Sequence, residues 1–182
     1  MFISMRCPEK DKQTEGMLKS KENAMKEQIM KTAGELIQPS KDIARAFSQK
    51  RDQLAAQGNQ LMGERPDLEK LTGKGNRQMA EDNNRNFARF MESMFLNYDP
   101  NVLAETVLWV FRAYRAHGFQ TTYWAANLNI WLDMLEQSLT REEFNATSPF
   151  YNWLIVNIPV FVALTDETCG NGTPLPERFR HN

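Results

Sequence analysis

The most constraining feature of the sequence is the stretch PNVLAETVLWVFRAYRAHG, residues 100–118. Asp99 before it is a favoured helix cap, Pro100 suits the first turn, and Gly118 can adopt the left-handed conformation that ends a helix. Apolar side chains occupy most of the circumference of this predicted helix, from Val102 to Tyr114. Such a helix must be covered by other elements on nearly all sides, so we expect it at the centre of the fold.

The rest of the sequence repeats the same helical spacing of apolar residues. The segments that show it are 25–37, 43–55, 66–73, 76–97, 123–139, 140–147 and 149–164. No segment has the strict alternation of a half-buried strand. The pattern therefore predicts an all-α fold, with about six to eight helices in a single domain.

Several residues predict where these helices begin and end. Ser40 is expected to cap the second helix and Gly58 to end it. Thr140 and Glu143 have the spacing of a capping box for a short helix. Ser148 and Pro149 are then expected to open a separate last helix, and Pro159 should kink or break it because proline has no amide hydrogen.

Composition sets the domain limits and excludes some functions. The 182 residues are 41% hydrophobic, enough for one core, which we place at residues 21–165 between flexible tails at 1–20 and 166–182. The net charge of -1 provides no field for nucleic acid or an anionic membrane. The apolar run 150–164 is shorter than a membrane span of about 20 residues. Two isolated cysteines, Cys7 and Cys169, suit a reducing cytoplasm.

The sequence lacks the usual signatures of catalysis and of metal binding. It contains two histidines, His117 and His181, and no Gly-x-Ser-x-Gly elbow, phosphate-binding loop or Glu-x-x-His pair. His117 falls in the last turn of a helix, where a polar side chain complements the exposed carbonyls. A haem ligand is expected within a helix facing a pocket, so a haem globin is disfavoured. We therefore predict a protein that is not an enzyme and has no metal and no cofactor.

The large aromatic and methionine side chains allow two interpretations. At helical spacing they commonly fill a core. Alternatively, some of them line a pocket for a small apolar ligand, such as a fatty acid or a tetrapyrrole-like molecule. The residues proposed for this pocket are Phe90, Met94, Trp109, Tyr114 and Trp131.

The first predicted helix carries a narrow apolar stripe among charged faces. A stripe of this width is typical of a helix that pairs with a copy of itself, and docking on its own core is the equal alternative. The residues proposed for a homodimer interface are Met25, Ile29, Met30, Leu36 and Ile37.

Three stretches between residues 43 and 166 resemble a known kind of domain. They are RPDLEKLTGKGNRQMAEDNNRNFARFMESMF, YDPNVLAETVLWVFRAYRAHGFQTTYWAANLNIWL and SPFYNWLIVNIPVFVAL. Their order and lengths resemble helical sensor domains of bacterial signalling proteins, of the globin-like, non-haem type, including those found before cobalamin-binding modules. The resemblance implies an all-helical, commonly dimeric module with globin-like or simple bundle packing. It also implies an output protein, expected here to be a separate chain.

Two functional hypotheses follow. The first is a cytoplasmic, non-enzymatic regulatory domain that acts through protein contacts, as a homodimer with a separate signalling protein as partner. The second is a small-molecule sensor with an apolar ligand in the aromatic pocket. Alanine substitutions distinguish a pocket from a core. A pocket residue changed to Ala should lose ligand while the protein stays folded, whereas a core residue changed to Ala should lower the free energy of unfolding by about 2–5 kcal/mol.

Overall fold

The computed structural model describes residues 12–166, and within this part of the chain all regular structure is helical. The predicted all-α fold class is confirmed, with seven helices in the described residues. The helices are α1 (Lys12–Gly34), α2 (Lys41–Gly63), α3 (Leu68–Thr72), α4 (Arg77–Leu96), α5 (Pro100–Ala116), α6 (Thr121–Ser138) and α7 (Arg141–Thr165).

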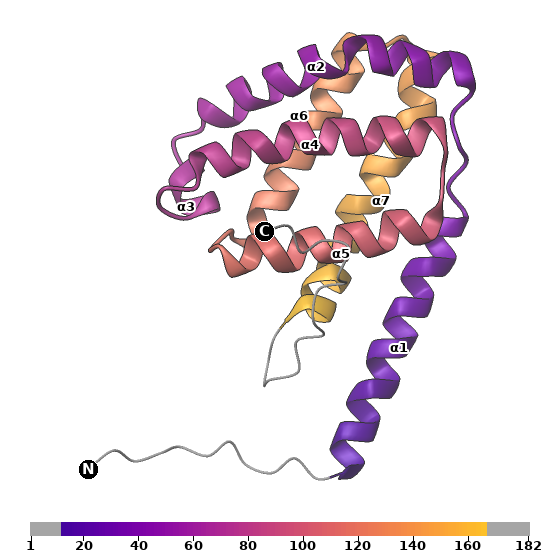
Figure 1. Ribbon diagram of the computed structural model, residues 1–182, viewed down its shortest axis with the longest axis vertical. Coiled ribbons are helices and arrows are strands. Elements are labelled where there is room, and N and C mark those ends of the chain that lie inside the picture. Colours follow the sequence, from indigo (N-terminus) through magenta and orange to yellow (C-terminus); the bar gives the residue numbers. More distant parts are fainter. Residues whose placement is uncertain (1–11, 167–182) are drawn as a thin grey trace, which may run out of the picture.

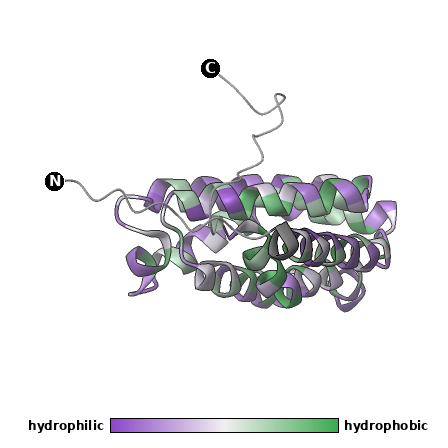
Figure 2. Cartoon of the chain, turned by 90° about the horizontal axis from the view of Figure 1, so that it is seen from below, coloured by the Kyte–Doolittle hydropathy of each residue, from purple (hydrophilic) through white to green (hydrophobic). Residues whose placement is uncertain are grey.

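The helices cross in two layers. In Figure 1, α2, α4 and α5 run across the view, and α6 and α7 cross them at a steep angle. Helix α2 packs on both α4 and α6, whereas α5 packs on α1 and α7. Seen from below in Figure 2, hydrophobic residues lie mainly on the inward sides of the helices and hydrophilic residues on the outward sides. Helices α4 and α5 are therefore held by different partners, and a space between them can persist.

Several predicted caps are confirmed by their hydrogen bonds. The Asp99 carboxylate accepts from the backbone N–H of Asn101 at 2.8 Å, and Pro100 is the first residue of α5. Thr140 and Glu143 form the reciprocal capping box of α7. Gly118 has a φ of 95°, the left-handed conformation expected after α5.

Two predicted boundaries were wrong. Gly58 does not end α2, which continues to Gly63. It is buried where α2 meets α6, and a Cβ there would lie 3.2 Å from the Met134 methyl carbon, so the absence of a side chain permits close packing. Ser148 and Pro149 do not open a new helix either, because they lie inside the continuous α7.

Helix α7 also continues through Pro159 to Thr165, so the predicted break does not occur there. The Asn157 carboxamide donates to the Trp153 carbonyl at 2.8 Å in the turn before this proline. The carbonyl that Pro159 leaves without an amide donor is that of Ile155, four residues earlier, so this bond does not replace the missing one and the packing of α7 must tolerate it.

The first helix is longer than predicted. It begins at Lys12, within the segment predicted to be a tail up to residue 20. The other terminal predictions, including the cysteines Cys7 and Cys169 and the segment after Asp166, lie outside the described residues.

One helix of the described chain, α7, is long and apolar enough to cross a membrane by length and composition alone. Its most apolar window is 44% buried inside the protein, and core helices of soluble proteins have the same property. Phe150, Tyr151 and Phe161 are fully buried against the other helices. Helix α7 therefore packs as a core helix, and its length and apolar composition are only weak evidence for a membrane span.

Candidate ligand-binding cavity

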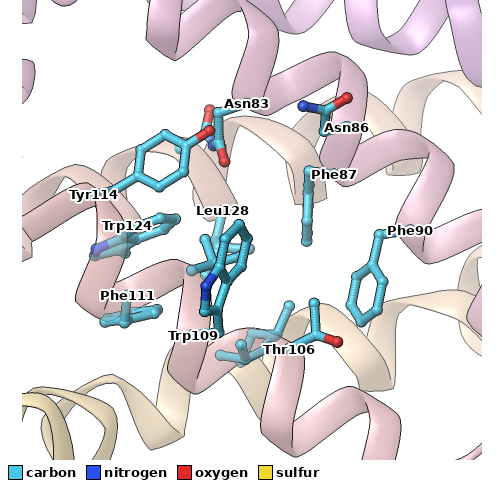
Figure 3. A pocket seen from close by; sticks show the side chains of 14 residues that line it. Asn83, Asn86, Phe87, Phe90, Thr106, Trp109, Phe111, Tyr114, Trp124 and Leu128 are labelled. Atoms are coloured by element: carbon cyan, nitrogen blue, oxygen red, sulfur yellow. The ribbon is translucent and has the colours of Figure 1, made fainter. Parts of the chain in front are cut away.

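A cavity of about 310 Å³ lies between α4, α5 and α6. Side chains of α4 and α5 form two facing walls, α6 closes the cavity behind them, and Leu154 of α7 contributes one further contact. Figure 3 shows the labelled lining side chains pointing toward one another across this space. Its position follows from the packing of the fold, because α4 is held by α2 while α5 is held by α1 and α7.

Aromatic rings from three helices surround the cavity. Phe87 and Phe90 come from α4, Trp109 and Phe111 from α5, and Trp124 from α6. Phe111 and Trp124 are stacked, with ring centroids 4.3 Å apart and an interplanar angle of 21°. These two rings cover each other's faces and form a packed apolar wall, and an apolar lining of this kind favours an apolar ligand.

One end of the cavity is polar. Figure 3 shows the Tyr114 hydroxyl close to the Asn83 carboxamide, on the side of the cavity away from Phe90. Asn83 donates a hydrogen bond from Nδ2 to the Tyr123 hydroxyl at 3.2 Å. Asn127, one helical turn after Tyr123 on α6, also lines the cavity.

Two buried polar atoms in the cavity lining have no hydrogen-bond partner in the described part of the chain. They are the Asn127 Oδ1 atom and the Trp124 Nε1 atom, on residues that are 2% and 6% exposed. A buried polar atom without a partner costs about 1–3 kcal/mol. Both atoms are enclosed by the surrounding protein, so they lie within the packed wall and not on the surface of the cavity.

No charged side chain is among the described residues that line the cavity. Burial, together with the nearby negative charge of Asp82, raises the pKa of Tyr114 above its ordinary value of 10.0. The Tyr114 hydroxyl is consequently protonated and neutral at physiological pH. The site as a whole is uncharged and favours an uncharged ligand.

The structure divides the five predicted pocket residues into two groups. Phe90, Trp109 and Tyr114 line the cavity. Met94 is 3% exposed and Trp131 is fully buried, and both belong to the core instead. Trp131 donates from Nε1 to the Asn84 carboxamide oxygen at 3.0 Å, which holds its ring on the α2 side of α4.

The sequence analysis missed the polar members of the cavity, Asn83, Asn86, Thr106 and Asn127. A signal for Asn127 existed, because it shares the apolar face of α6 with Tyr123 and Trp124 at helical spacing. A carboxamide on such a face must find a partner or face a cavity.

A second buried asparagine fixes the position of α4. Asn84 donates from Nδ2 to the Asn59 carboxamide oxygen at 3.0 Å and accepts from Trp131. Asn59 in turn donates to the Glu81 carbonyl at 3.2 Å. This network joins α2, α4 and α6, and it orients the neighbouring turn of α4 that presents Asn83 and Phe87 to the cavity.

The five predicted interface residues also have different surroundings, and Leu36 and Ile37 lie after α1, which ends at Gly34 and not near residue 37 as predicted. Ile29 is 1% exposed and belongs to the core, and Met30 and Leu36 pack against that core. Met25 is half-buried, whereas Ile37 is 85% exposed. The second half of the helix therefore docks on its own core.

Other candidate sites have less support. A cavity of about 350 Å³ beside α3 is bordered by Arg65 and Arg77, but these pair with Asp67 at 2.9 Å and Glu81 at 3.4 Å. No group of three potential metal ligands occurs in residues 12–166.

Comparisons of the chain with protein-family models, with curated proteins and with solved structures find no match. The resemblance to globin-like sensor domains therefore stays a prediction, and the argument for function depends on the cavity.

Proposed function

We propose that this protein is a small-molecule sensor domain that binds one apolar molecule in the cavity between α4, α5 and α6. The observation that carries the proposal is a cavity of about 310 Å³ between α4, α5 and α6, lined mainly by aromatic and other apolar side chains. A cavity of about 150 Å³ with apolar walls is enough to bind benzene. The volume here suits a molecule of about two or three fused rings and disfavours the larger tetrapyrroles.

We further propose a cytoplasmic, non-enzymatic regulatory role through contacts with other proteins, including a separate signalling protein. The connections of α5 support this role, because α5 forms one wall of the cavity and also packs on α1 and α7. Arg115 of α5 donates to the Val162 carbonyl at 3.1 Å and to the Thr165 hydroxyl at 2.9 Å. A ligand that moves α5 would therefore shift the helices that reach the surface.

The projecting half of α1 supports a homodimer as the form in which the domain acts. Figure 1 shows this half extending away from the other helices, and it carries Met17 and Leu18, which are 70% and 48% exposed. Replacement of both residues by Asp should yield a monomer by light scattering, with Lys21→Asp as the control on the same segment. An unchanged mass of the double variant relative to wild type would remove the dimer from the proposal.

Cavity-filling substitutions test the ligand site. Val107 is 6% exposed and lines the cavity, so Val107→Phe should occupy the space that a ligand needs. Val102 lies on the same helix, is 43% exposed and does not line the cavity, which makes Val102→Phe a matched control. Calorimetric titration with naphthalene should detect binding to wild type and to Val102→Phe, but not to Val107→Phe.

Equal naphthalene affinity in both variants would place binding elsewhere, and no binding to wild type would contradict the sensor proposal. If Val107→Phe does not fold, Leu128→Phe fills the same cavity from the side formed by α6. Circular dichroism of each variant verifies folding before titration.

A further inference from the structure

The last turns of α7, residues 159–165, lack several of the interactions that usually stabilise the end of a helix. Pro159 has no amide hydrogen, so the carbonyl of Ile155 loses its usual helical donor. No Lys or Arg of α7 lies in its last turn, and Asp166 after it has an extended backbone instead of the left-handed conformation that commonly satisfies terminal carbonyls. This end of the helix therefore depends on contacts with another element.

Arg115, in the last turn of α5, supplies polar contacts of this kind. Its guanidinium donates to the Val162 carbonyl at 3.1 Å, to the Thr165 hydroxyl at 2.9 Å and to the Asp166 carboxylate at 2.7 Å. The last four carbonyls of a helix lack an intrahelical donor, and a cation beside them also complements the negative end of the helix dipole. Arg115 thus caps α7 from a neighbouring helix.

An apolar contact holds the same end of α7 on α5. Phe161 is fully buried, and its ring packs on that of Phe111 with the ring centroids 5.2 Å apart. Phe111 and Arg115 are four residues apart and so lie on one face of α5. In Figure 1 the yellow end of α7 passes α5 and projects beyond it.

The turn of α5 that holds this end of α7 also belongs to the wall of the cavity. Phe111 and Tyr114 line the cavity, and Arg115 follows Tyr114 directly. Residues 111–115 therefore contact both the cavity and the end of α7. A ligand that packs on the ordered wall stabilises it by mass action, and the contacts of that wall with α7 are stabilised with it.

From these observations we infer that the end of α7, residues 159–166, is a ligand-controlled clamp. It stays docked on α5 through Arg115 when the cavity is occupied, and it opens more often when the cavity is empty. This inference rests on the proposed function, since it names the regulation of the same cavity.

Hydrogen exchange of individual backbone amides in the full chain, measured by NMR with and without naphthalene, tests the clamp. Exchange reports local opening even when the open form is rare. We expect saturating naphthalene to slow exchange of the amides of residues 161–166 by about fivefold or more, the usual range of coupling between two sites. The last turn of α2, which ends at Gly63 and does not line the cavity, should change less.

The variant Arg115→Gln separates a clamp from a merely structural contact. It should speed exchange at residues 161–166 without ligand and remove most of the slowing by naphthalene, whereas a structural role would leave the slowing intact. Naphthalene should still bind, as calorimetric titration verifies, because Arg115 does not line the cavity. Arg112→Gln on the same helix is the matched control, since Arg112 makes none of the three hydrogen bonds to α7, and it should behave as wild type.

If Arg115→Gln does not fold, Asp166→Asn weakens one of the three bonds at an exposed position and should change exchange in the same direction by a smaller factor. The outcomes distinguish the two proposals. Naphthalene binding that leaves exchange at residues 161–166 unchanged in wild type would overturn the clamp while the cavity remains a binding site. Equal slowing in wild type and in Arg115→Gln would overturn the role of Arg115. Failure of wild type to bind naphthalene would overturn the proposed function and the clamp with it.

Discussion

Asn84 and Asn127 are buried carboxamides on the two sides of the same fold, and the difference between them is instructive. Asn84 is 1% exposed and both ends of its carboxamide are paired, with Asn59 and Trp131. Asn127 is 2% exposed and its oxygen has no partner in the described chain. Pairing joins three helices at Asn84, whereas the unpaired group lies at a cavity. The side around Asn84 is built for stability, and the side around Asn127 retains an unmet interaction.

The largest expected effect contrasts two tryptophans. Trp131 is fully buried on the packed side, so Trp131→Ala should lower the free energy of unfolding by about 3–5 kcal/mol. Trp109 is only partly buried and borders the cavity, so Trp109→Ala should cost less and should weaken naphthalene binding. Urea denaturation measures both costs. Equal costs would mean that the two sides are packed alike.

The next effect concerns the paired asparagine. Asn84→Leu removes the acceptor of the Trp131 indole and the donor to Asn59, so it should destabilise the protein by about 1–3 kcal/mol. The same urea series measures it, with Asn129→Leu as an exposed control on α6. A stability equal to that of the control would show that the network contributes nothing.

The same Asn-to-Leu substitution at Asn127 should change the free energy of unfolding in the opposite direction. Asn127→Leu removes a buried polar atom that has no described partner, so we expect the free energy of unfolding to rise by about 1 kcal/mol. The transition midpoint in urea should increase in the absence of ligand. A loss of stability comparable to that of Asn84→Leu would contradict the difference between the two sides.

The smallest effect is the pH dependence of another well-paired group. The backbone N–H of Thr140 and the nearby Lys50 lower the pKa of Glu143 below its ordinary value of 4.5. The stabilisation by this carboxylate is complete above pH 4.5 and is lost as pH falls through the lowered pKa of the folded state. Glu143→Gln should therefore flatten the acid side of the stability profile. A stability profile identical to that of wild type would show that the Glu143 carboxylate does not contribute to the pH dependence of stability.

Local signals in the sequence predict the helices well and their packing poorly. Asp99, Pro100 and Gly118 define α5 because capping and backbone conformation are local properties. Gly58 misled the prediction because its role depends on Met134, which is distant in sequence. Pro149 misled it because a proline inside a long buried helix can be tolerated when tertiary packing compensates.

The cavity was predictable only in part. Aromatic spacing identified Phe90, Trp109 and Tyr114, which line it. The same spacing also selected Met94 and Trp131, because periodicity shows which face of a helix is buried and not which helix it contacts. Trp131 of α6 instead bonds to Asn84 of α4 and packs edge-to-face on Phe87, and these contacts depend on tertiary packing rather than on any local pattern.

The most direct test of the central claim uses the four tryptophans of the chain, whose indole N–H groups give four signals in a nitrogen–proton correlation spectrum. Trp→Phe variants assign the signals, and naphthalene is then added to the wild-type protein. Ligand in the cavity should shift the signals of Trp109 and Trp124 most, and leave Trp153, which donates to Thr32 at 3.0 Å, nearly unchanged. No shift, or a largest shift at Trp153, would contradict a ligand site between α4, α5 and α6.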